Sequence, residues 1–219
     1  GTYLHEFPLA FRTVVATVFL EGGLFFGSFT FAGVYLRTKF SLSYAVTGAL
    51  MASAGYIVVM PDYPGFGDSR APHPYVHLSL GESTYAMIQK AKSTLKYMLA
   101  SARHNGRIYL IGYSEGGFAT MAAAKTLQGK SVAVTAAVPC AGSYDLAGTM
   151  VDEVLSGEEA LVPYYIPYTV HGYASVYRSV EPAAWEYSAL LKPPLPSILD
   201  TLFSGNRSGA EVSAAMPSN

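Results

Sequence analysis

The sequence holds few of the residues that form cross-links, charged surfaces or metal sites. Among its 219 residues there is one cysteine, Cys140, so a disulfide within the chain is excluded. Charged residues make up only 13% of the chain and its net charge is −1. The composition therefore gives no electrostatic basis for binding nucleic acid or an anionic membrane surface. The histidines and cysteines indicate no metal site, and we expect no metal ion or other cofactor.

A membrane-spanning helix is not expected either. Residues 14–36 have the length of a span, but Glu21 lies inside this stretch beside two glycines, and a charge within a bilayer is costly. Side chains alternate on both sides of the glycines, which predicts two strands, at 14–20 and 24–36. The apolar composition, 51% hydrophobic residues with a mean hydropathy of +0.26, instead indicates a large core, an apolar binding surface or a missing partner segment.

The most informative motif is G-x-S-x-G at residues 112–116. Residues 107–111 before it are β-branched, aromatic and aliphatic, which predicts a buried strand, and residues 117–127 after it favour a helix. A sharp strand–helix turn of this kind exposes the serine hydroxyl, so Ser114 is a candidate nucleophile and is expected in a sparsely populated backbone conformation. The backbone N–H of Glu115 is a candidate oxyanion donor. The tight turn is expected to require glycine at both flanks. The alternative is an ordinary glycine-rich turn with a surface serine.

Apolar runs alternate with helical segments along the middle of the chain. We expect a helix at 42–54 closed by Gly55, a strand at 56–60 and a polar loop at 61–69. A helix at 79–102 follows, with Ser79 and Glu82 as a capping box, and a further strand at 132–138. This alternation predicts an α/β fold with a mostly parallel sheet flanked by helices, in which Val58 and Leu110 lie on neighbouring strands.

The character of the sequence changes after Asp145. Residues 162–177 are dense in tyrosine and proline, and no further strand of the first kind follows. We expect a core in residues 1–145 and a helical cap in residues 146–219, in which residues 161–177 cover Ser114 with aromatic side chains. The alternative is a tyrosine-rich packing layer without a cavity.

Several of these motifs together resemble a known family. Residues 55–69, then His73-Pro74-Tyr75, then residues 112–117 are similar to the secretory-lipase branch of the α/β-hydrolases, in the family order. The resemblance covers residues 42–219 and implies Ser114 as nucleophile, the Glu115 N–H as oxyanion donor and Asp62 beside the oxyanion hole. It also implies a secreted or periplasmic protein. Asp62 as an ordinary turn residue is the alternative, and His73 and His77 are interpreted as structural.

The chain departs from the family at the other two members of the triad. The family order is serine, acid, histidine, with the last two late in the chain. Here His171 is the only histidine after Ser114, and it lies in the segment interpreted as cap. A triad of Ser114, Asp145 and His171 keeps the order. The preferred interpretation is that the chain stops within the cap and is a slow hydrolase by itself, whereas a longer chain with a later acid and histidine would be active.

The function predicted is that of a serine carboxylic-ester hydrolase, a lipase or esterase of lipid degradation. It would act on a small-molecule ester or a lipid through an acyl-enzyme on Ser114. An aminopeptidase-like acyl hydrolase uses the same turn and is one alternative. A non-catalytic α/β-hydrolase-like binding module is the other, because the acid and histidine of the triad are not evident.

Overall fold

The computed structural model describes residues 48–49, 52–53, 55–69, 72–98, 103–157 and 162–216, without the side chains of Lys96 and Met98. The two strands predicted at 14–20 and 24–36 lie outside the described residues. Within the helix predicted at 42–54, residues 48–49 and 52–53 are helical. The N–H of Gly55 donates to the carbonyl of Ala52 at 2.9 Å, and Gly55 has φ of +89°. This is the glycine helix end that the sequence predicts.

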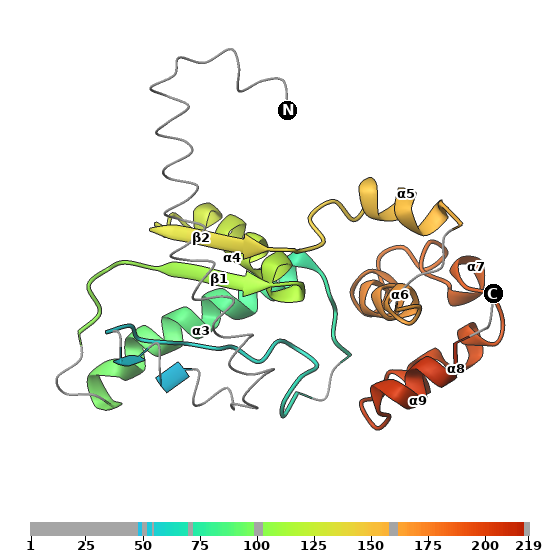
Figure 1. Ribbon diagram of the computed structural model, residues 1–219, viewed down its shortest axis with the longest axis horizontal. Coiled ribbons are helices and arrows are strands. Elements are labelled where there is room, and N and C mark those ends of the chain that lie inside the picture. Colours follow the sequence, from blue (N-terminus) through green and yellow to red (C-terminus); the bar gives the residue numbers. More distant parts are fainter. Residues whose placement is uncertain are drawn as a thin grey trace, which may run out of the picture.

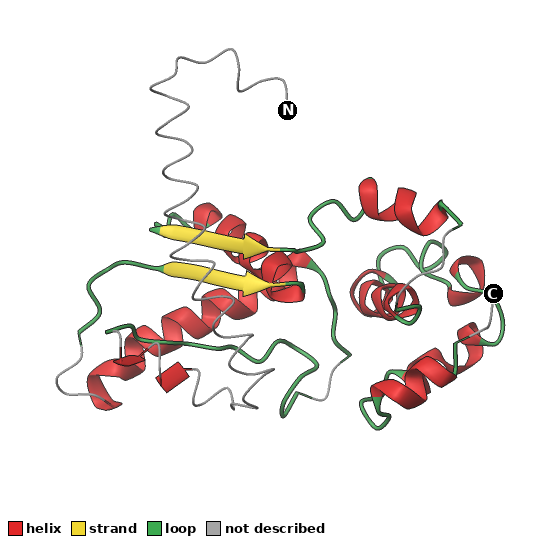
Figure 2. Ribbon diagram, viewed as in Figure 1, coloured by secondary structure: helices red, strands yellow, loops and turns green. Residues whose placement is uncertain are grey.

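Two parallel strands and two long helices form the first part of the fold (Figures 1 and 2). The helix α3 spans His77–Met98, the strand β1 Tyr109–Tyr113, the helix α4 Glu115–Gly129 and the strand β2 Ala136–Cys140. Tyr109 pairs with Ala136 and Tyr113 with Cys140. The strands are parallel because α4 crosses over between them. The predicted α/β class is confirmed, with a described sheet of two strands.

The core of this part lies where α4 packs on the strands and on α3. The buried side chains of α4 are mostly small, and the larger ones contact Ile108, Leu110 and Leu80. Gly81 of α3 lies so close to α4 that an added Cβ would be 2.2 Å from Thr126 Oγ1. Small residues on both helices therefore let α4 pack closely against α3 and the sheet.

The strand predicted at residues 56–60 is not formed in this structure. These residues belong to neither strand, and the partner of β1 is β2. The segment still lies beside β1, because the rings of Tyr56 and Tyr109 meet edge to face at 5.9 Å between centroids. This segment, β1 and α3 line a cavity of about 650 Å³. An apolar run favours an extended chain, but strand pairing also needs backbones about 4.8 Å apart.

The predicted start of α3 was also wrong. The helix begins at His77, so Ser79 and Glu82 lie inside its first turns and form no capping box. Glu82 instead forms an ion pair with Lys130 at the end of α4, at 3.1 Å. A capping box occurs at the helix α9 (Gly209–Ala214), where Ser208 Oγ accepts from the Glu211 N–H and Glu211 Oε2 accepts from the Ser208 N–H. The capping-box pattern is short and occurs by chance, so the packing of the helices decides which occurrence of it caps a helix.

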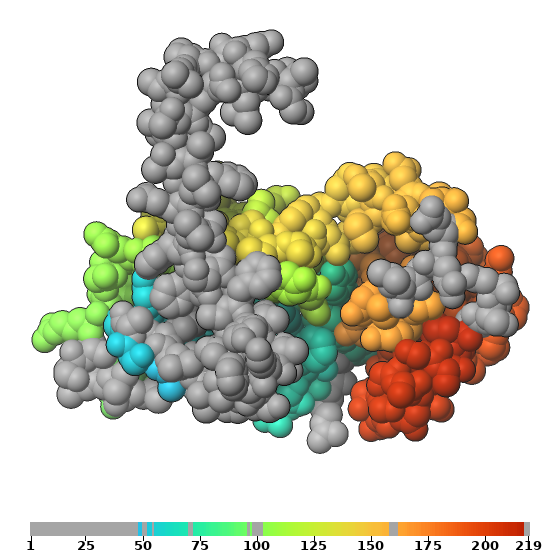
Figure 3. Space-filling view, in the orientation of Figure 1, coloured from blue at the N-terminus to red at the C-terminus, as the bar shows by residue number. Residues whose placement is uncertain are grey.

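All described residues after 145 form helices, turns and loops. The helices are α5 (Thr149–Leu155), α6 (Tyr165–Tyr177), α7 (Tyr187–Leu190), α8 (Leu195–Leu202) and α9 (Gly209–Ala214). Leu195, Leu199 and Leu202 are buried along one face of α8, against α6, α7 and α9. Figure 3 shows α5–α9 as a lobe beside the part that holds the strands, and in Figure 1 α6 lies beyond the carboxyl ends of β1 and β2. No helix within the described ranges is long and apolar enough to cross a membrane.

Candidate active site

Ser114 occupies the turn between β1 and α4 in a strained backbone conformation. Its φ is 57° and its ψ is −119°, a backbone conformation that residues other than glycine rarely adopt. The prediction of a sparsely populated conformation is thus confirmed. The Ser114 N–H donates to the carbonyl of Cys140 at the end of β2, at 2.9 Å. Its hydroxyl makes no capping bond to α4 and has no partner within the described part of the chain. The hydroxyl is therefore unengaged at the carboxyl edge of the sheet.

The glycines of the motif have different roles. A Cβ at Gly112 would lie 2.0 Å from the carbonyl oxygen of Gly116, and one at Gly117 would lie 2.3 Å from that of Cys140. Nothing lies within 4 Å of a Cβ at Gly116. The prediction that both flanking glycines are sterically required is wrong for Gly116. The close contacts are at Gly112, where α4 turns back over β1, and at Gly117, where α4 meets β2.

The first turn of α4 presents free N–H groups next to Ser114. The carbonyl of Ser114 accepts from Gly117 and Phe118, at 2.9 and 3.2 Å. The N–H groups of Glu115 and Gly116 have no acceptor among the residues that the structure describes. Free N–H groups at a helix N-terminus, together with the helix dipole, favour a negative charge. This end of α4 can therefore stabilise an oxyanion.

The Glu115 side chain contacts a buried histidine. His73 Nε2 lies 2.5 Å from Glu115 Oε1, and these two buried atoms have no other partner in the described residues. His73 Nδ1–H donates to the carbonyl of Pro64 at 2.7 Å. The structural role predicted for His73 agrees with these contacts. No local pattern in the sequence indicates the Glu115 side chain as the partner of His73, because the two residues are 42 positions apart.

Aromatic rings enclose His73. Tyr63, Phe66, Tyr75 and Tyr168 have ring centroids 4.5–6.3 Å from that of the imidazole. Burial raises the pKa of four tyrosines, and the Glu115 carboxylate adds to the rise in each; they are Tyr63, Tyr75, Tyr165 and Tyr168. Tyr165 and Tyr168 belong to α6, so the aromatic segment predicted as cap lies near the residue after Ser114.

Asp62 lies in the loop that His73 holds. Its side chain is exposed, and an added Cβ at Gly67 would lie 2.8 Å from Asp62 Oδ2. Gly67 has φ of +59°, so the carboxylate packs against a glycine turn of its own loop. Both interpretations of Asp62, as a turn residue and as a neighbour of the oxyanion hole, stay predictions.

Asp145 and His171 are not paired with each other. The Asp145 carboxylate accepts from the N–H groups of Gly148 and Thr149 at the start of α5, at 3.0 and 2.9 Å. These bonds and the Thr149 hydroxyl lower the pKa of Asp145. An aspartate ahead of a helix caps its free N–H groups. Asp145 therefore serves the start of α5 in this structure and is not the acid partner of His171.

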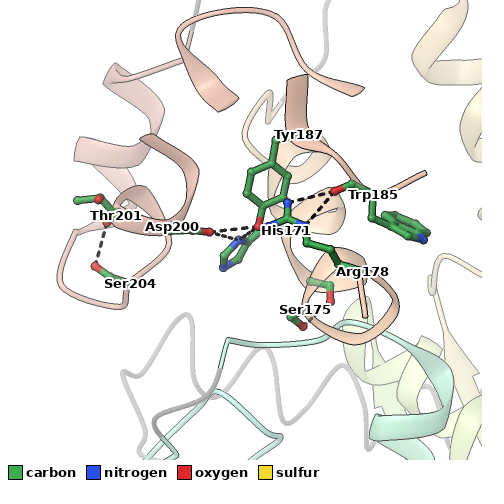
Figure 4. Close-up of polar contacts among 9 residues, drawn as sticks. His171, Ser175, Arg178, Trp185, Tyr187, Asp200, Thr201 and Ser204 are labelled. Atoms are coloured by element: carbon green, nitrogen blue, oxygen red, sulfur yellow. Dashed lines mark hydrogen bonds and ion pairs between the residues drawn. The ribbon is translucent and has the colours of Figure 1, made fainter. Parts of the chain in front are cut away.

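His171 belongs to a separate polar cluster within the C-terminal helices (Figure 4). Its Nδ1 donates to Tyr187 Oη at 2.9 Å, and the Tyr187 hydroxyl donates to Asp200 Oδ1 at 3.1 Å. Arg178 lies over the Tyr187 ring, 4.0 Å from its centroid. The cluster and Pro72 line a hollow of about 440 Å³. In the described part of the chain no imidazole hydrogen-bonds to Ser114 Oγ, so the predicted triad is not assembled here.

We expect His171 to make stability depend on pH. Burial is the main cause of its lowered pKa, Arg178 also lowers it, and Asp200 opposes them. The unfolded chain then binds more protons than the native one, so the free energy of unfolding decreases as pH falls through about 6.5 and levels off below the native pKa. Each unit between the two pKa values is worth about 1.4 kcal/mol. Urea unfolding at pH 7.5 and 5.0 should show a smaller change in His171→Gln than in the unmodified chain. An equal change would contradict this, and exposed His104→Gln is the control.

The described ranges hold no cluster of metal-ligating side chains. They contain no group of three or more histidine, cysteine, aspartate or glutamate side chains that could hold a metal ion. The features near Ser114 are a hydroxyl, backbone N–H groups, one ion pair and aromatic rings. Such a set suits chemistry carried by the serine itself.

Comparisons with known proteins give a consistent result. The family model for secretory lipases matches residues 41–152, just over half of the chain. A solved structure from Legionella pneumophila, described as a candidate hydrolase, has a TM-score of 0.62 and 26% identity over 75% of this chain and 43% of that chain. A mutant of the rice cell wall degrading esterase LipA from Xanthomonas oryzae has a TM-score of 0.55 and 24% identity, over 71% and 42%.

The matched part of this chain therefore covers less than half the length of either solved protein. The search of curated proteins yields no match. The family match includes the loop of Asp62, the His73 contact and the turn of Ser114, which the structure brings together at one edge of the sheet. The chain belongs to the secretory lipase family of the α/β-hydrolases.

Proposed function

We propose that the protein hydrolyses carboxylic esters through an acyl-enzyme formed on Ser114. The observation that carries this proposal is the unengaged Ser114 hydroxyl on a strained turn, directly before the free N–H groups of Glu115 and Gly116. A hydroxyl and oxyanion donors at one point are the two components that acyl transfer requires. Membership of the secretory lipase family supports an ester or lipid substrate and a secreted protein.

In the proposed reaction Ser114 Oγ attacks the ester carbonyl carbon and gives up its proton to a base. The carbonyl oxygen becomes negative and is stabilised by the Glu115 N–H at the start of α4, with the loop of Asp62 alongside. The tetrahedral intermediate then expels the alcohol, which takes up a proton, and leaves an ester on Ser114. Water attacks this acyl-enzyme, which releases the acid and restores the hydroxyl.

A histidine is the expected base, but His171 does not fit that role here. Its Nδ1 is engaged by Tyr187 and Asp200, and the hollow it borders is lined by Pro72 and residues of the C-terminal helices, none from the turn of Ser114. Without a base the serine is a weak nucleophile, and loss of the base from a serine triad costs several powers of ten in rate. We therefore propose slow turnover by this chain and no dependence on His171.

We further propose that the C-terminal helices act as a cap. Tyr165 and Tyr168 of α6 lie near Glu115, and Tyr168 stacks on His73. An aromatic surface of this kind beside the nucleophile can bind the acyl chain of an ester.

The lack of an imidazole on Ser114 Oγ in the described residues favours one second candidate, a non-catalytic ester-binding module. The test is hydrolysis of nitrophenyl acetate, butyrate and octanoate by the chain, beside the nitroanilide of butyrate. We expect slow ester turnover, none of the anilide, and the same rates in His171→Gln. Preference for the anilide would favour the aminopeptidase-like alternative. Ester binding without turnover, measured by calorimetry, would favour the binding module.

A further inference from the structure

We propose that His73 is a positioning residue that holds the loop carrying Asp62 against the turn carrying Ser114. It would thereby set the relative positions of the groups assigned to the oxyanion hole. The inference rests on the proposed function, since it gives His73 a part in that reaction. It goes further in making a residue outside both segments responsible for their alignment.

The geometry behind this is a bridge through one imidazole ring. On one side His73 Nδ1–H donates to the carbonyl of Pro64, two residues after Asp62, at 2.7 Å. On the other side His73 Nε2 contacts Glu115 Oε1 at 2.5 Å, one residue after Ser114. Each ring nitrogen lies within contact distance of an oxygen atom, one in each segment. A single rigid side chain therefore links the two segments.

Burial makes the bridge strong. The His73 side chain is 3% exposed and that of Glu115 30%, and the two atoms in contact are themselves buried without a hydrogen-bond partner in the described residues. Separating such a pair would leave two buried polar atoms unsatisfied, which is more costly than losing an exposed ion pair. Gly65 also packs closely here. A Cβ added to Gly65 would lie 2.5 Å from the backbone nitrogen of His73, so the two backbones are in contact.

The same ring connects both segments to α6. Tyr168 stacks on the imidazole with an interplanar angle of 19°. An added Cβ at Gly172 would lie 2.8 Å from the carbonyl oxygens of His73 and Pro74, so the backbone of α6 touches this segment directly. The helix proposed as cap is therefore packed against the bridge, which limits the movement of His73.

This position has a consequence for catalysis. Oxyanion donors act by being fixed in place before the charge develops, and a misplacement of about 1 Å can cost about 100-fold in rate. The Glu115 N–H belongs to the same residue as the carboxylate that His73 holds. Loosening the bridge should lower kcat more than it raises KM, because the oxyanion is formed only in the transition state.

The first measurement is hydrogen–deuterium exchange in the full chain, which needs no activity. In His73→Gln, backbone N–H groups in residues 61–69 and 114–118 should exchange at least about tenfold faster, whereas those of α9 should not change. Glu115→Gln should do the same, and the double variant should be no worse than either single one, because both remove one bridge. His104→Gln is the control, because His104 is exposed and among the described residues bonds to the N–H of Gly106 alone. A response in only one of the two segments, or additive responses, would overturn the proposal.

The second measurement is ester turnover by the same variants. His73→Gln should lower kcat roughly 10- to 100-fold and change KM by less than about twofold, and His104→Gln should change neither. An unchanged kcat, or a change in KM alone, would overturn the positioning role. If the unmodified chain turns over no more ester than Ser114→Ala, the proposed function fails, and the exchange measurement decides the bridge separately.

Discussion

Ser114→Ala and Ser114→Gly should both abolish ester turnover by this protein, and Ser114→Gly should be the more stable of the two variants. Both variants lack the hydroxyl that forms the acyl-enzyme, so both should lose all turnover above the uncatalysed rate. The backbone strain at φ of 57° and ψ of −119° remains in alanine but is relieved in glycine. Strain of this kind costs about 1–3 kcal/mol, and part of the gain is offset by the greater freedom of glycine in the unfolded chain. Ser114→Gly should therefore be about 1 kcal/mol more stable than Ser114→Ala.

The measurements are nitrophenyl butyrate hydrolysis and urea unfolding of the three proteins. Covalent labelling by a fluorophosphonate, followed by intact mass, adds a direct test of the nucleophile, since the label should be found on the unmodified chain and not on either variant. Turnover that survives in both variants would show that another group carries the chemistry. Equal stability of the two variants would show that the turn stores no strain at this position.

Gly112→Ala should destabilise the protein strongly, whereas Gly116→Ala should not. The added methyl at Gly112 would lie 2.0 Å from the carbonyl oxygen of Gly116 and 2.6 Å from Thr120 Oγ1. Backbone contacts of this kind cannot be relieved by rotating a side chain, so α4 must move away from β1. Overpacking costs about 1–3 kcal/mol and occasionally more, and we expect the upper end of that range. At Gly116 there is open space, and alanine in a helix is favoured over glycine by up to about 1 kcal/mol.

Activity should follow the same order. Moving the start of α4 displaces the N–H groups proposed for the oxyanion, so Gly112→Ala should lower kcat even where the protein is still folded. Gly116→Ala keeps its N–H group and should retain the turnover of the unmodified chain. Thermal unfolding and ester hydrolysis of the two variants provide the comparison. Equal behaviour of the pair would show that the turn can adjust, contrary to the contacts seen here.

Local sequence was sufficient for the nucleophile turn because all its determinants lie within a few residues. The apolar residues before Ser114, the glycines around it and the small residues after it specify a strand, a strained turn and a helix without help from elsewhere. The parallel direction of β1 and β2 could be predicted as well, since a helix between two strands leaves little alternative. The change to helices after residue 145 agrees with the absence of further strand-like apolar runs in that part of the sequence.

Contacts between distant residues could not be predicted in this way. Residues 56–60 have the composition of a strand, but pairing also depends on how closely their backbone approaches β1, and the described partner of β1 is β2. Ser79 and Glu82 match a capping box, yet Glu82 reaches Lys130 because α3 and α4 pack together. The order of residues along the chain suggested Asp145 as the acid partner of His171. The packing of α6 against α7 and α8 instead brings Tyr187 and Asp200 to His171.

The sequence by itself determined the family, the α/β class and the serine at the turn, because each depends on short-range patterns of side-chain size and polarity. Only the tertiary structure decided that Gly112 and Gly117 are tightly packed while Gly116 is free, and that His73 joins Pro64 to Glu115. These features depend on which backbones approach each other after the helices pack on the strands. Burial then gives a contact between two polar atoms an energetic weight that spacing along the chain does not reveal.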